Sequence, residues 1–475
     1  MRSSLRYVST RGQAPKLGFE AALLTGLARD GGLYVPETWP NLSASRLAKF
    51  AGRPYAEVAA AVMKPFIGSA LSAKELDAAI AAAYGTFRHD AVAPLTQIDE
   101  GLWLMELFHG PTLAFKDVAL QLLGQLYDRV LKARGERITV IGATSGDTGS
   151  AALEACKNRD AIDIFILHPK GRVSEVQRRQ MTTIDASNVH NIAIDGSFDD
   201  CQDMVKAMFN DNAFRDRVNM AAVNSINWAR VMAQIVYYVT GALALGAPGR
   251  PVNFAVPSGN FGNVFAGYAA RAMGLPINQL IVGSNRNDIL TRFFTTGAMK
   301  TSKVTPSLSP SMDIQVSSNL ERLLFDLFDR KGEKLGAAMS EFRRSGRFEA
   351  PKKGWAKTAK LFKAHRLDDR ETLSAMRDIH RKTGMLVDPH SAIGIMAALE
   401  ERKGKKSDGI PTIALATAHP AKFPDAVEKA TGIRPALPAH LADLLDRREK
   451  LAELPNELGK VQDYVLAHTR LGHNR

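Results

Sequence analysis

The sequence predicts an α/β fold in which parallel sheets carry helices on both faces. Short apolar stretches alternate with helical ones from about residue 138 onward, and loops of small polar residues follow several of the apolar stretches. A hydrophobic content of 45% with 23% charged residues is typical of a globular protein. At 475 residues the chain exceeds one ordinary core, so we expect two or more packed units.

The N-terminal part of the chain differs from the rest. Residues 1–90 are rich in alanine and leucine, with helical periods over Phe19–Leu27 and Ser43–Val62 and no glycine-rich loop. We therefore expect a separate, mostly helical N-terminal domain over residues 1–90.

The strands and helices that follow can be placed in order along the chain. Strands are expected at Ile138–Ile141, Ile162–Leu167, Asn191–Ile194, Ala221–Val223, Val252–Val256, Gln279–Gly283 and Thr412–Ala416. Helices are expected over Ala151–Cys156, about Asp199–Phe209, Trp228 to about Leu245, a stretch ending at Met273, and about Asn319–Phe328. Ligands of such folds bind at the carboxyl ends of strands, so the loops there are the candidate site. Val387–Ser391 is expected to be a turn at a strand end.

A lysine at a predicted helix start is the first candidate residue. Lys116 directly follows the largely apolar stretch Glu106-Leu-Phe-His-Gly-Pro-Thr-Leu-Ala-Phe115. A helical pattern of apolar residues begins at this lysine. The free N–H groups of a helix start and partial desolvation both disfavour the ammonium form. A neutral amine is what attack on an aldehyde requires. The alternative is a surface lysine at an ordinary helix start.

Two loops between a strand and a helix are candidate anion sites. Ser258–Asn263 has glycines at positions 259 and 262, which let backbone N–H groups converge on an anion. Its spacing matches neither the dinucleotide fingerprint nor the Walker loop, and an ordinary glycine-rich turn is the alternative. Thr144–Gly149 has the same placement and could hold a carboxylate or phosphate. Its alternative is a helix-capping turn in which Asp147 or Thr148 satisfies first-turn amides.

Charge and cysteine content limit the classes of function. The formal charge of +13 is spread over several patches that contain no interleaved aromatic residues, which favours a small anionic substrate over nucleic acid. No apolar run is long enough to span a bilayer, and the N-terminus lacks the apolar segment of a secretory signal. The two cysteines, Cys156 and Cys201, have no metal-type spacing, so we expect no metal site and a cytoplasmic location.

Placed in order, the motifs resemble those of threonine synthases. They are the lysine stretch, Thr-Ser-Gly-Asp-Thr-Gly149, Asn-Ser-Ile-Asn-Trp-Ala-Arg230, Ser-Gly-Asn-Phe-Gly-Asn263 and Ala-Thr417-Ala-His-Pro-Ala-Lys-Phe423. Tyr7-Val-Ser-Thr-Arg11-Gly and Asp30-Gly-Gly-Leu-Tyr-Val-Pro36 are similar to the opening domain of that family. The helical N-terminal domain together with the long inserted tract resembles its bacterial and fungal branch. The resemblance covers nearly the whole chain and is weakest over residues 330–370 and the C-terminal tail.

The resemblance implies an enzyme of fold type II that depends on pyridoxal 5′-phosphate. Its domains would be residues 1–90, a catalytic region of two α/β lobes over 91–435 with an insertion at about 300–370, and a helical tail over 436–475. Lys116 would bind the cofactor covalently and act as the base, with the other cofactor contacts at Gly259, Asn260, Phe261, Gly262, Asn263 and Thr417. Substrate contacts would come from Ser145, Gly146, Asp147, Thr148, Asn224 and Arg230.

The implied reaction converts O-phospho-L-homoserine and water to L-threonine and phosphate. Two alternatives remain: a threonine or serine dehydratase of the same fold type, and a non-catalytic binder of phosphoamino acids. His109, His390 and His419 lie in or near these motifs with their roles open. We expect no nucleic-acid or membrane partner, and either a monomer or a homodimer.

Overall fold

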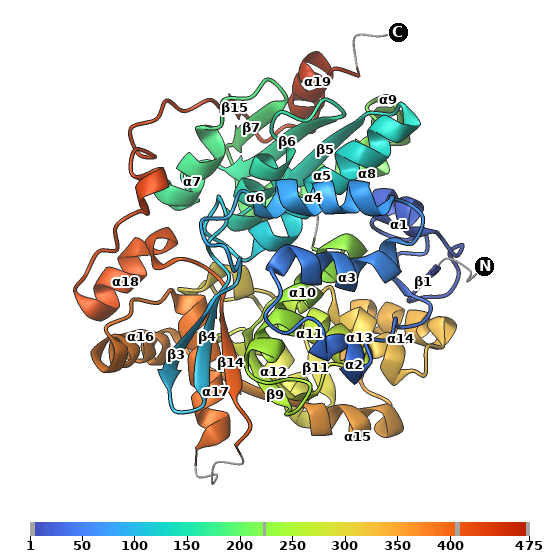
Figure 1. Ribbon diagram of the computed structural model, residues 1–475. Coiled ribbons are helices and arrows are strands. Elements are labelled where there is room, and N and C mark those ends of the chain that lie inside the picture. The colour runs from blue at the N-terminus through green and yellow to red at the C-terminus, as the bar shows by residue number, and fades with distance from the viewer. Residues whose placement is uncertain (1–4, 222–224, 404–408, 472–475) are drawn as a thin grey trace. The chain divides into compact units, whose positions relative to one another are not determined.

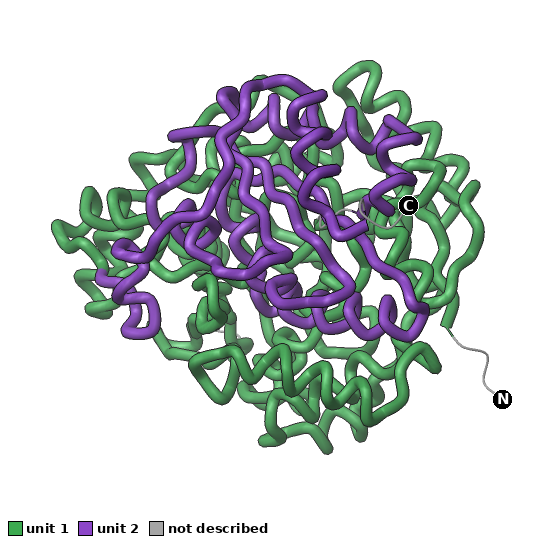
Figure 2. Tube along the Cα trace, turned by 90° about the horizontal axis from the view of Figure 1, so that it is seen from above, with its two compact units in different colours: residues 1–115, 225–435 green, residues 116–224, 436–475 purple. Residues whose placement is uncertain are grey.

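The computed structural model describes residues 5–221, 225–403 and 409–471. The chain forms two compact units, and neither is continuous in sequence. Unit 1 consists of Met1–Phe115 and Ser225–Pro435, and unit 2 of Lys116–Asn224 and Ala436–Arg475 (Figure 2, green and purple). The chain therefore passes from unit 1 to unit 2 between Phe115 and Lys116.

Unit 1 contains a six-stranded sheet with the strand order β13-β10-β9-β14-β4-β3. Its strands are β3 (Leu95–Asp99), β4 (Leu102–Glu106), β9 (Val252–Pro257), β10 (Ile277–Ser284), β13 (Phe362–Arg366) and β14 (Thr412–Ala416). The pairings are parallel except that between β3 and β4. The predicted strands at Val252, Gln279 and Thr412 are confirmed, whereas β3, β4 and β13 were not predicted.

Helices cover both faces of this sheet, as predicted. A Cβ added at Gly283 of β10 would lie 3.0 Å from Ile393 of α17 (Pro389–Arg402). Leu280 has the opposite parity on the strand and lies on the other face. There it approaches Gly267 of α11 (Gly262–Ala272), whose added Cβ would be 2.9 Å from Leu280 Cδ2.

The N-terminal part of unit 1 is mostly helical, with one small antiparallel pair of strands. It comprises β1 (Tyr7–Ser9), α1 (Phe19–Thr25), β2 (Tyr34–Pro36), α2 (Ala44–Ala48), α3 (Tyr55–Ile67) and α4 (Ala73–Tyr84). The helical period expected over Ser43–Val62 is broken into two helices. Gly52, with φ +70°, and Pro54, which precedes α3, cause the break.

Unit 1 also contains helices and two short strands that lie outside this sheet (Figure 1). They are α10 (Trp228–Ala244), α12 (Ile289–Thr296), β11 (Ala298–Lys300), η1 (Pro310–Met312), α13 (Leu320–Leu327), α14 (Gly332–Ser345), β12 (Arg347–Glu349), α15 (Lys352–Leu361), α16 (Asp369–Thr383), η2 (Pro420–Lys422) and α18 (Pro424–Thr431). The turn expected at Val387–Ser391 is not at a strand end. It is the start of α17, because Asp388 caps the helix and Pro389 suits its first position.

Unit 2 contains a five-stranded sheet with the order β15-β7-β6-β5-β8. The strands are β5 (Ile138–Ala143), β6 (Ile162–Pro169), β7 (Val189–Ile194), β8 (Met220–Ala221) and β15 (Ala452–Leu454), all paired in parallel. The expected strands at Ile138, Ile162 and Asn191 are confirmed. Of the strand expected over Ala221–Val223, residues 222 and 223 lie outside the described residues.

The helices of unit 2 lie on both faces of its sheet. They are α5 (Lys116–Arg134), α6 (Asp147–Cys156), α7 (Glu175–Thr182), α8 (Phe198–Asn210), α9 (Asn212–Arg217), α19 (Leu458–His468) and the short η3 (Ala439–Leu441). Across the sheet, β6 lies beside β5 and β7 lies beside β6, whereas β8 lies on the opposite side of β5. Right-handed crossovers then place α6 and α7 on one face and α8 and α9 on the other. Phe165 and Leu167 of β6 share an apolar cluster with residues of α8 and α19.

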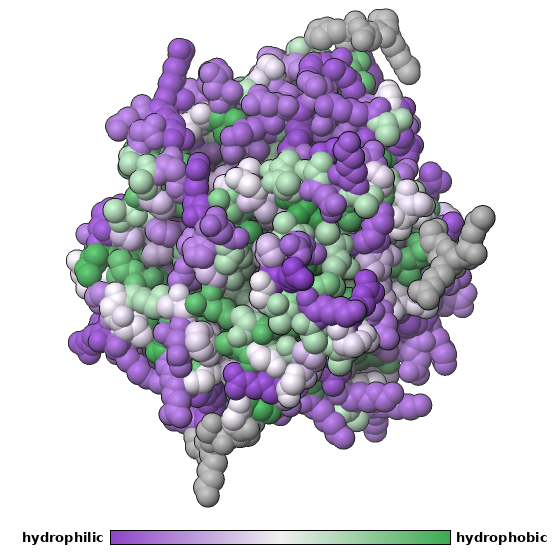
Figure 3. Space-filling view, viewed as in Figure 1, coloured by the Kyte–Doolittle hydropathy of each residue, from purple (hydrophilic) through white to green (hydrophobic). Residues whose placement is uncertain are grey.

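Hydrophilic and apolar residues are intermixed on the face shown in Figure 3. Among the helices that the structure describes, none is both long enough and apolar enough to cross a lipid bilayer.

Candidate active site

Lys116 is the first residue of α5, as the sequence predicted, and it is 8% exposed. Its Nζ lies 3.0 Å from Oδ2 of Asp147, the first residue of α6. Burial agrees with the expected desolvation. The carboxylate was not anticipated as a partner, and it favours the ammonium form instead of the neutral amine.

The loop before α6 holds Asp147 in a fixed orientation. Oδ1 of Asp147 accepts a hydrogen bond of 2.8 Å from Nε2 of Gln177 in α7. The capping role expected of Asp147 or Thr148 belongs to Thr144, whose hydroxyl oxygen accepts from the N–H groups of Gly146 (3.0 Å) and Gly149 (2.9 Å). Unit 2 therefore brings the predicted loop and the predicted lysine together.

The predicted substrate residues of this loop differ in exposure. Ser145 is exposed, Thr148 is half-buried, and Gly146 and Asp147 are buried. Gly146 has φ +143°, which a residue with a side chain rarely adopts, and its added Cβ would lie 2.5 Å from Gln177 Oε1. Of these residues, Ser145 is thus the one most open to a ligand.

The loop between β9 and α11 in unit 1 has the form of an anion cradle. Phe261, with φ +61°, is left-handed and directly precedes the first residue of α11, Gly262. Within the part of the chain that the structure describes, none of the N–H groups of residues 259–262 donates to a protein acceptor. Such N–H groups at a helix start bind phosphate through hydrogen bonds and the helix dipole.

Asn263 adds a buried donor to this cradle. Its Oδ1 accepts from the hydroxyls of Tyr237 (2.5 Å) and Tyr238 (2.9 Å) in α10. Its Nδ2 is buried and has no hydrogen-bond partner among the described residues. A buried donor without an acceptor is costly, so the site suits a bound oxyanion.

The glycines of the cradle are needed for close packing. A Cβ at Gly259 would lie 2.7 Å from the carbonyl oxygen of Ser311 and 3.0 Å from Cα of Met312. A Cβ at Gly262 would lie 3.3 Å from Nδ2 of Asn319. The loop is therefore more than an ordinary glycine-rich turn, because its backbone lies against neighbouring segments that leave little room.

Thr417 lies at the same edge of the unit 1 sheet as the cradle. It directly follows β14, and the cradle directly follows the neighbouring parallel strand β9. Thr417 is 6% exposed, its N–H donates to Oγ of Ser391 (3.1 Å), and its carbonyl accepts from the N–H of Phe115 (2.9 Å). Lys116 is the next residue in the chain after Phe115.

Arg230 lies in the first turn of α10 and is 5% exposed, so it is not a surface arginine. Asn227 caps this helix by accepting from the N–H of Ala229 (3.0 Å). Asn224, the other substrate residue predicted in this segment, lies outside the described residues.

The sequence did not single out Asn319, which joins two predicted parts of the site. It is fully buried, and both its N–H and its Nδ2 donate to the carbonyl of Asn260 at 3.1 Å. Nδ2 also donates to the carbonyl of Ser225, again at 3.1 Å. The only feature of the local sequence that draws attention to Asn319 is its position directly before helix α13. That position does not predict its contacts with Asn260 and Ser225.

Two histidines from the motifs have defined contacts. Nε2 of His109 lies 2.8 Å from Oε2 of Glu106, and this contact contributes to a lowered pKa of Glu106 against the opposing effect of burial. His419 caps the short helix η2 through Nδ1, which accepts from the N–H of Ala421 (3.2 Å).

A buried lysine at a helix start, an amide cradle suited to phosphate and a threonine after a parallel strand are the features that the sequence analysis expects of a pyridoxal-phosphate enzyme of fold type II. A family model described as "Pyridoxal-phosphate dependent enzyme" matches residues 87–342. Models described as "Threonine synthase N terminus" and "Threonine synthase, C-terminal" match residues 6–84 and 391–465. The chain belongs to the threonine synthase family, and its cofactor is pyridoxal 5′-phosphate.

Known relatives match over nearly the whole chain. The threonine synthase of Pseudomonas aeruginosa is 56% identical over 469 residues, which cover 98% of this chain and 99% of that protein. The crystal structure of a threonine synthase from Brucella melitensis with bound pyridoxal phosphate has 54% identity and a TM-score of 0.96, covering 98% and 100% of the two chains. The yeast enzyme structure has 38% identity and a TM-score of 0.93, with 98% and 99% covered.

Proposed function

We propose that this chain makes L-threonine and phosphate from O-phospho-L-homoserine and water, with the residues above in the roles that follow. The observation that carries the proposal is the match to threonine synthases at 56% identity over 98% of the chain. The buried Lys116 at the start of α5 supports it, since a protein that only bound phosphoamino acids would have no use for that amine. The match also favours this reaction over that of a dehydratase.

The reaction replaces a C–O bond at Cγ of the substrate by a C–O bond at Cβ. The Cγ–O bond to phosphate breaks, the oxygen of water bonds to Cβ, and Cγ becomes a methyl group. Bound pyridoxal phosphate supplies an electron sink for the negative charge that develops beside the amino group. The protein must remove and return the proton on Cα and move protons at Cβ and Cγ.

Lys116 is the proposed acid–base for these proton transfers. General acid–base help from a positioned group is worth roughly 10²–10⁴-fold in rate. Asp147, whose Oδ2 lies 3.0 Å from the amine, holds Nζ in one direction and stabilises the proton when the lysine carries it. Gln177 keeps that carboxylate from rotating, because it donates to the other oxygen at 2.8 Å.

The remaining residues would hold the anionic groups. Residues 259–263 are proposed to bind the cofactor phosphate through backbone N–H groups, and Thr417 to contact the pyridine nitrogen. The substrate carries a carboxylate and a phosphate. We assign Ser145–Thr148 to one of these groups and Arg230, with the segment that contains Asn224, to the other. The planar guanidinium suits bidentate binding of an oxyanion.

The test is a product balance with the purified chain. O-Phospho-L-homoserine should yield phosphate and threonine in equal amounts. Deamination of threonine or serine without phosphate release from phosphohomoserine would indicate a dehydratase, and tight binding without turnover would indicate a binding protein.

We further propose a cytoplasmic location and a monomeric or homodimeric state. The location rests on Cys156 and Cys201, which are both buried free thiols, as expected of a reducing compartment. Burial raises the pKa of each thiol to about 12, which keeps both unreactive. Analytical ultracentrifugation of the purified chain tests the oligomeric state.

A further inference from the structure

Asp388 has more partners than helix capping requires. Its carboxylate is fully buried at the start of α17 and accepts from the N–H groups of His390 and Ser391, both at 3.0 Å. These contacts satisfy the helix start. The same carboxylate also contacts two side chains: Nδ1 of His390 at 2.7 Å, and the hydroxyl of Ser391, which donates to it.

The serine contact leads to Thr417. Because the hydroxyl proton of Ser391 is donated to Asp388, the lone pairs of its oxygen remain as acceptors. That oxygen accepts the N–H of Thr417 at 3.1 Å. Asp388 thereby fixes which way the hydroxyl points, and the hydroxyl fixes the backbone of the residue assigned to the pyridine nitrogen.

The histidine contact leads to the cradle. An anionic acceptor at Nδ1 holds the ring proton there, which leaves Nε2 as an acceptor. Nε2 of His390 accepts the N–H of Ser311 at 3.3 Å. The carbonyl of the same Ser311 and Cα of Met312 are the atoms that lie against Gly259, with no space for a Cβ between them.

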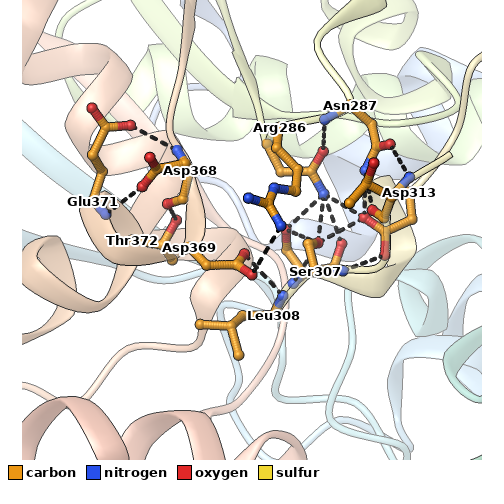
Figure 4. Close-up of polar contacts among 12 residues, drawn as sticks. Arg286, Asn287, Ser307, Leu308, Asp313, Asp368, Asp369, Glu371 and Thr372 are labelled. Atoms are coloured by element: carbon orange, nitrogen blue, oxygen red, sulfur yellow. Dashed lines mark hydrogen bonds and ion pairs between the residues drawn. The ribbon is translucent and has the colours of Figure 1, made fainter. Parts of the chain in front are cut away.

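The segment that contains Ser311 is anchored at its other side by a second polar cluster (Figure 4). Oδ1 of Asp313 accepts from Nδ2 of Asn287 (2.8 Å) and from the hydroxyl of Ser307 (2.6 Å). The N–H of Leu308 donates to Asp369 of α16 at 3.2 Å. The segment is thus tied to the end of β10, to α16 and, through His390, to α17.

We propose that Asp388 is a positioning residue for the cofactor at both of its ends. Through Ser391 it holds Thr417 at the nitrogen end, and through His390 it holds Ser311 and Met312 against Gly259 at the phosphate end. The inference rests on the proposed placement of the cofactor phosphate at residues 259–263 and of its nitrogen at Thr417.

The variant Asp388→Asn breaks this arrangement with little change of shape. The asparagine amide has one acceptor oxygen and one NH₂ donor group, whereas the aspartate carboxylate has two acceptor oxygens. With its NH₂ group toward His390, the ring would carry its proton on Nε2, which would face the N–H of Ser311. With the NH₂ group toward Ser391, the hydroxyl would lose its acceptor.

The experiment titrates the apo-enzyme with pyridoxal phosphate and records the affinity and the absorption spectrum of the bound cofactor. Asp388→Asn should raise the cofactor Kd by about ten- to a hundredfold, as expected for a lost charge-assisted hydrogen bond, and shift the absorption maximum. The control is Asp368→Asn. Asp368 caps α16 through a reciprocal pair of hydrogen bonds with Glu371 (Figure 4). Asparagine caps a helix about as well as aspartate, so this variant should leave Tm, Kd and spectrum nearly unchanged.

Two further variants separate the contacts and keep the test valid if Asp388→Asn does not fold. Ser391→Ala removes the acceptor for Thr417, so it should shift the spectrum and weaken pyridoxal and pyridoxal phosphate equally. His390→Asn keeps a donor toward Asp388 and loses the acceptor for Ser311, so it should reduce the preference for pyridoxal phosphate over pyridoxal.

Unchanged affinity and spectrum in Asp388→Asn, or in both single-contact variants, would overturn the inference and leave Asp388 a helix cap. These readouts need no substrate. A wild-type chain that binds the cofactor but makes no threonine would contradict the proposed function, whereas the comparison of cofactor binding among the variants would still decide the role of Asp388.

Discussion

The amine of Lys116 and the carboxylate of Asp147 lie 3.0 Å apart in unit 2, at the first residues of α5 and α6. Both side chains are buried, with relative exposures of 10% and 6%. A helix start and apolar neighbours disfavour a charged lysine, whereas this carboxylate favours it. The balance between the two sets the pH at which the amine can attack an aldehyde.

Asp147→Asn should therefore move covalent capture of the cofactor to lower pH, because the amide no longer stabilises the ammonium form. Rates of reconstitution of the apo-enzyme with pyridoxal phosphate, measured across pH, give the midpoint. The control is Asp160→Asn, since Asp160 is exposed and pairs with Lys132 in the same unit. A midpoint that stays in place or rises would show that Asp147 does not control the amine.

The two glycines of the cradle should differ in their tolerance of alanine. Gly259→Ala places Cβ 2.7 Å from a backbone carbonyl, whereas Gly262→Ala meets a side-chain amide at 3.3 Å. Overpacking of this kind costs about 1–3 kcal/mol, and the loop can relieve it only by moving its N–H groups away from the position in which they would bind phosphate. Restoring that position on binding would repeat the cost, so Gly259→Ala should raise the cofactor Kd by up to about a hundredfold and Gly262→Ala by less. Gly18→Ala, which adds Cβ into open space, is the control. Equal affinities for all three would argue against a phosphate site in this loop.

Arg230→Ala should leave the absorbance of the bound cofactor intact while it raises KM, lowers kcat, or both. The loss should be about ten- to a hundredfold if a charge-assisted hydrogen bond to substrate is removed. Arg230→Lys keeps the charge but not the planar fork, so it should recover part of the activity. Loss of cofactor absorbance, or unchanged turnover, would make this buried arginine structural.

Acid should loosen α19 through His190. Burial, with His468 and Arg470 nearby and Asp163 opposing them, lowers the pKa of His190 from 6.5 to about 4. His190 of β7 lies against the rings of Tyr464 and His468 of α19, so it becomes exposed when α19 detaches. The exposed ring binds a proton below about pH 6.5 and the covered one only near pH 4, so the stability of α19 is lost as pH falls from 6.5 towards 4. Hydrogen exchange of Leu458–His468 at pH 7 and pH 5, corrected for intrinsic rates, measures this.

His190→Phe should reduce that acid effect, since it keeps a ring stacked on Phe165 and removes the titration. Part of the effect should remain, because burial also lowers the pKa of His168 in the same unit. An acid effect on α19 as large in the variant as in wild type would place its cause elsewhere.

The strands that position the site could be predicted because each is a short apolar run that the fold buries. β6 and β9 are buried throughout, and the alternation of such runs with helices is the pattern of a parallel sheet. β13 was missed because its sequence, Phe-Lys-Ala-His-Arg, is mostly polar, as suits the edge of a sheet. The helix start at Asp388 was misread as a turn at a strand end, although Asp-Pro is also a strong helix-start signal.

The site was predictable as motifs but not as contacts. Lys116 and the cradle carry local signals, which are an apolar helix start and paired glycines. The contacts of Asp147 with Lys116, of Asn319 with Asn260, and of Ser391 with Thr417 join segments far apart in sequence. No local pattern specifies such pairs, because they depend on the packing of the whole unit. The domain boundaries at 90 and 435 stay predictions.

The most direct test of the account is the position of the cofactor on the chain. Borohydride reduction of the cofactor-loaded enzyme, followed by peptide mass mapping, should place the pyridoxyl group on Lys116. Lys422 is the informative rival, because it is fully buried in the Ala416–Phe423 motif, with Nζ donating to the carbonyl of Thr112 at 2.7 Å. A pyridoxyl group on Lys422 or on any other lysine would contradict the assignment of Lys116 and of the catalytic base with it.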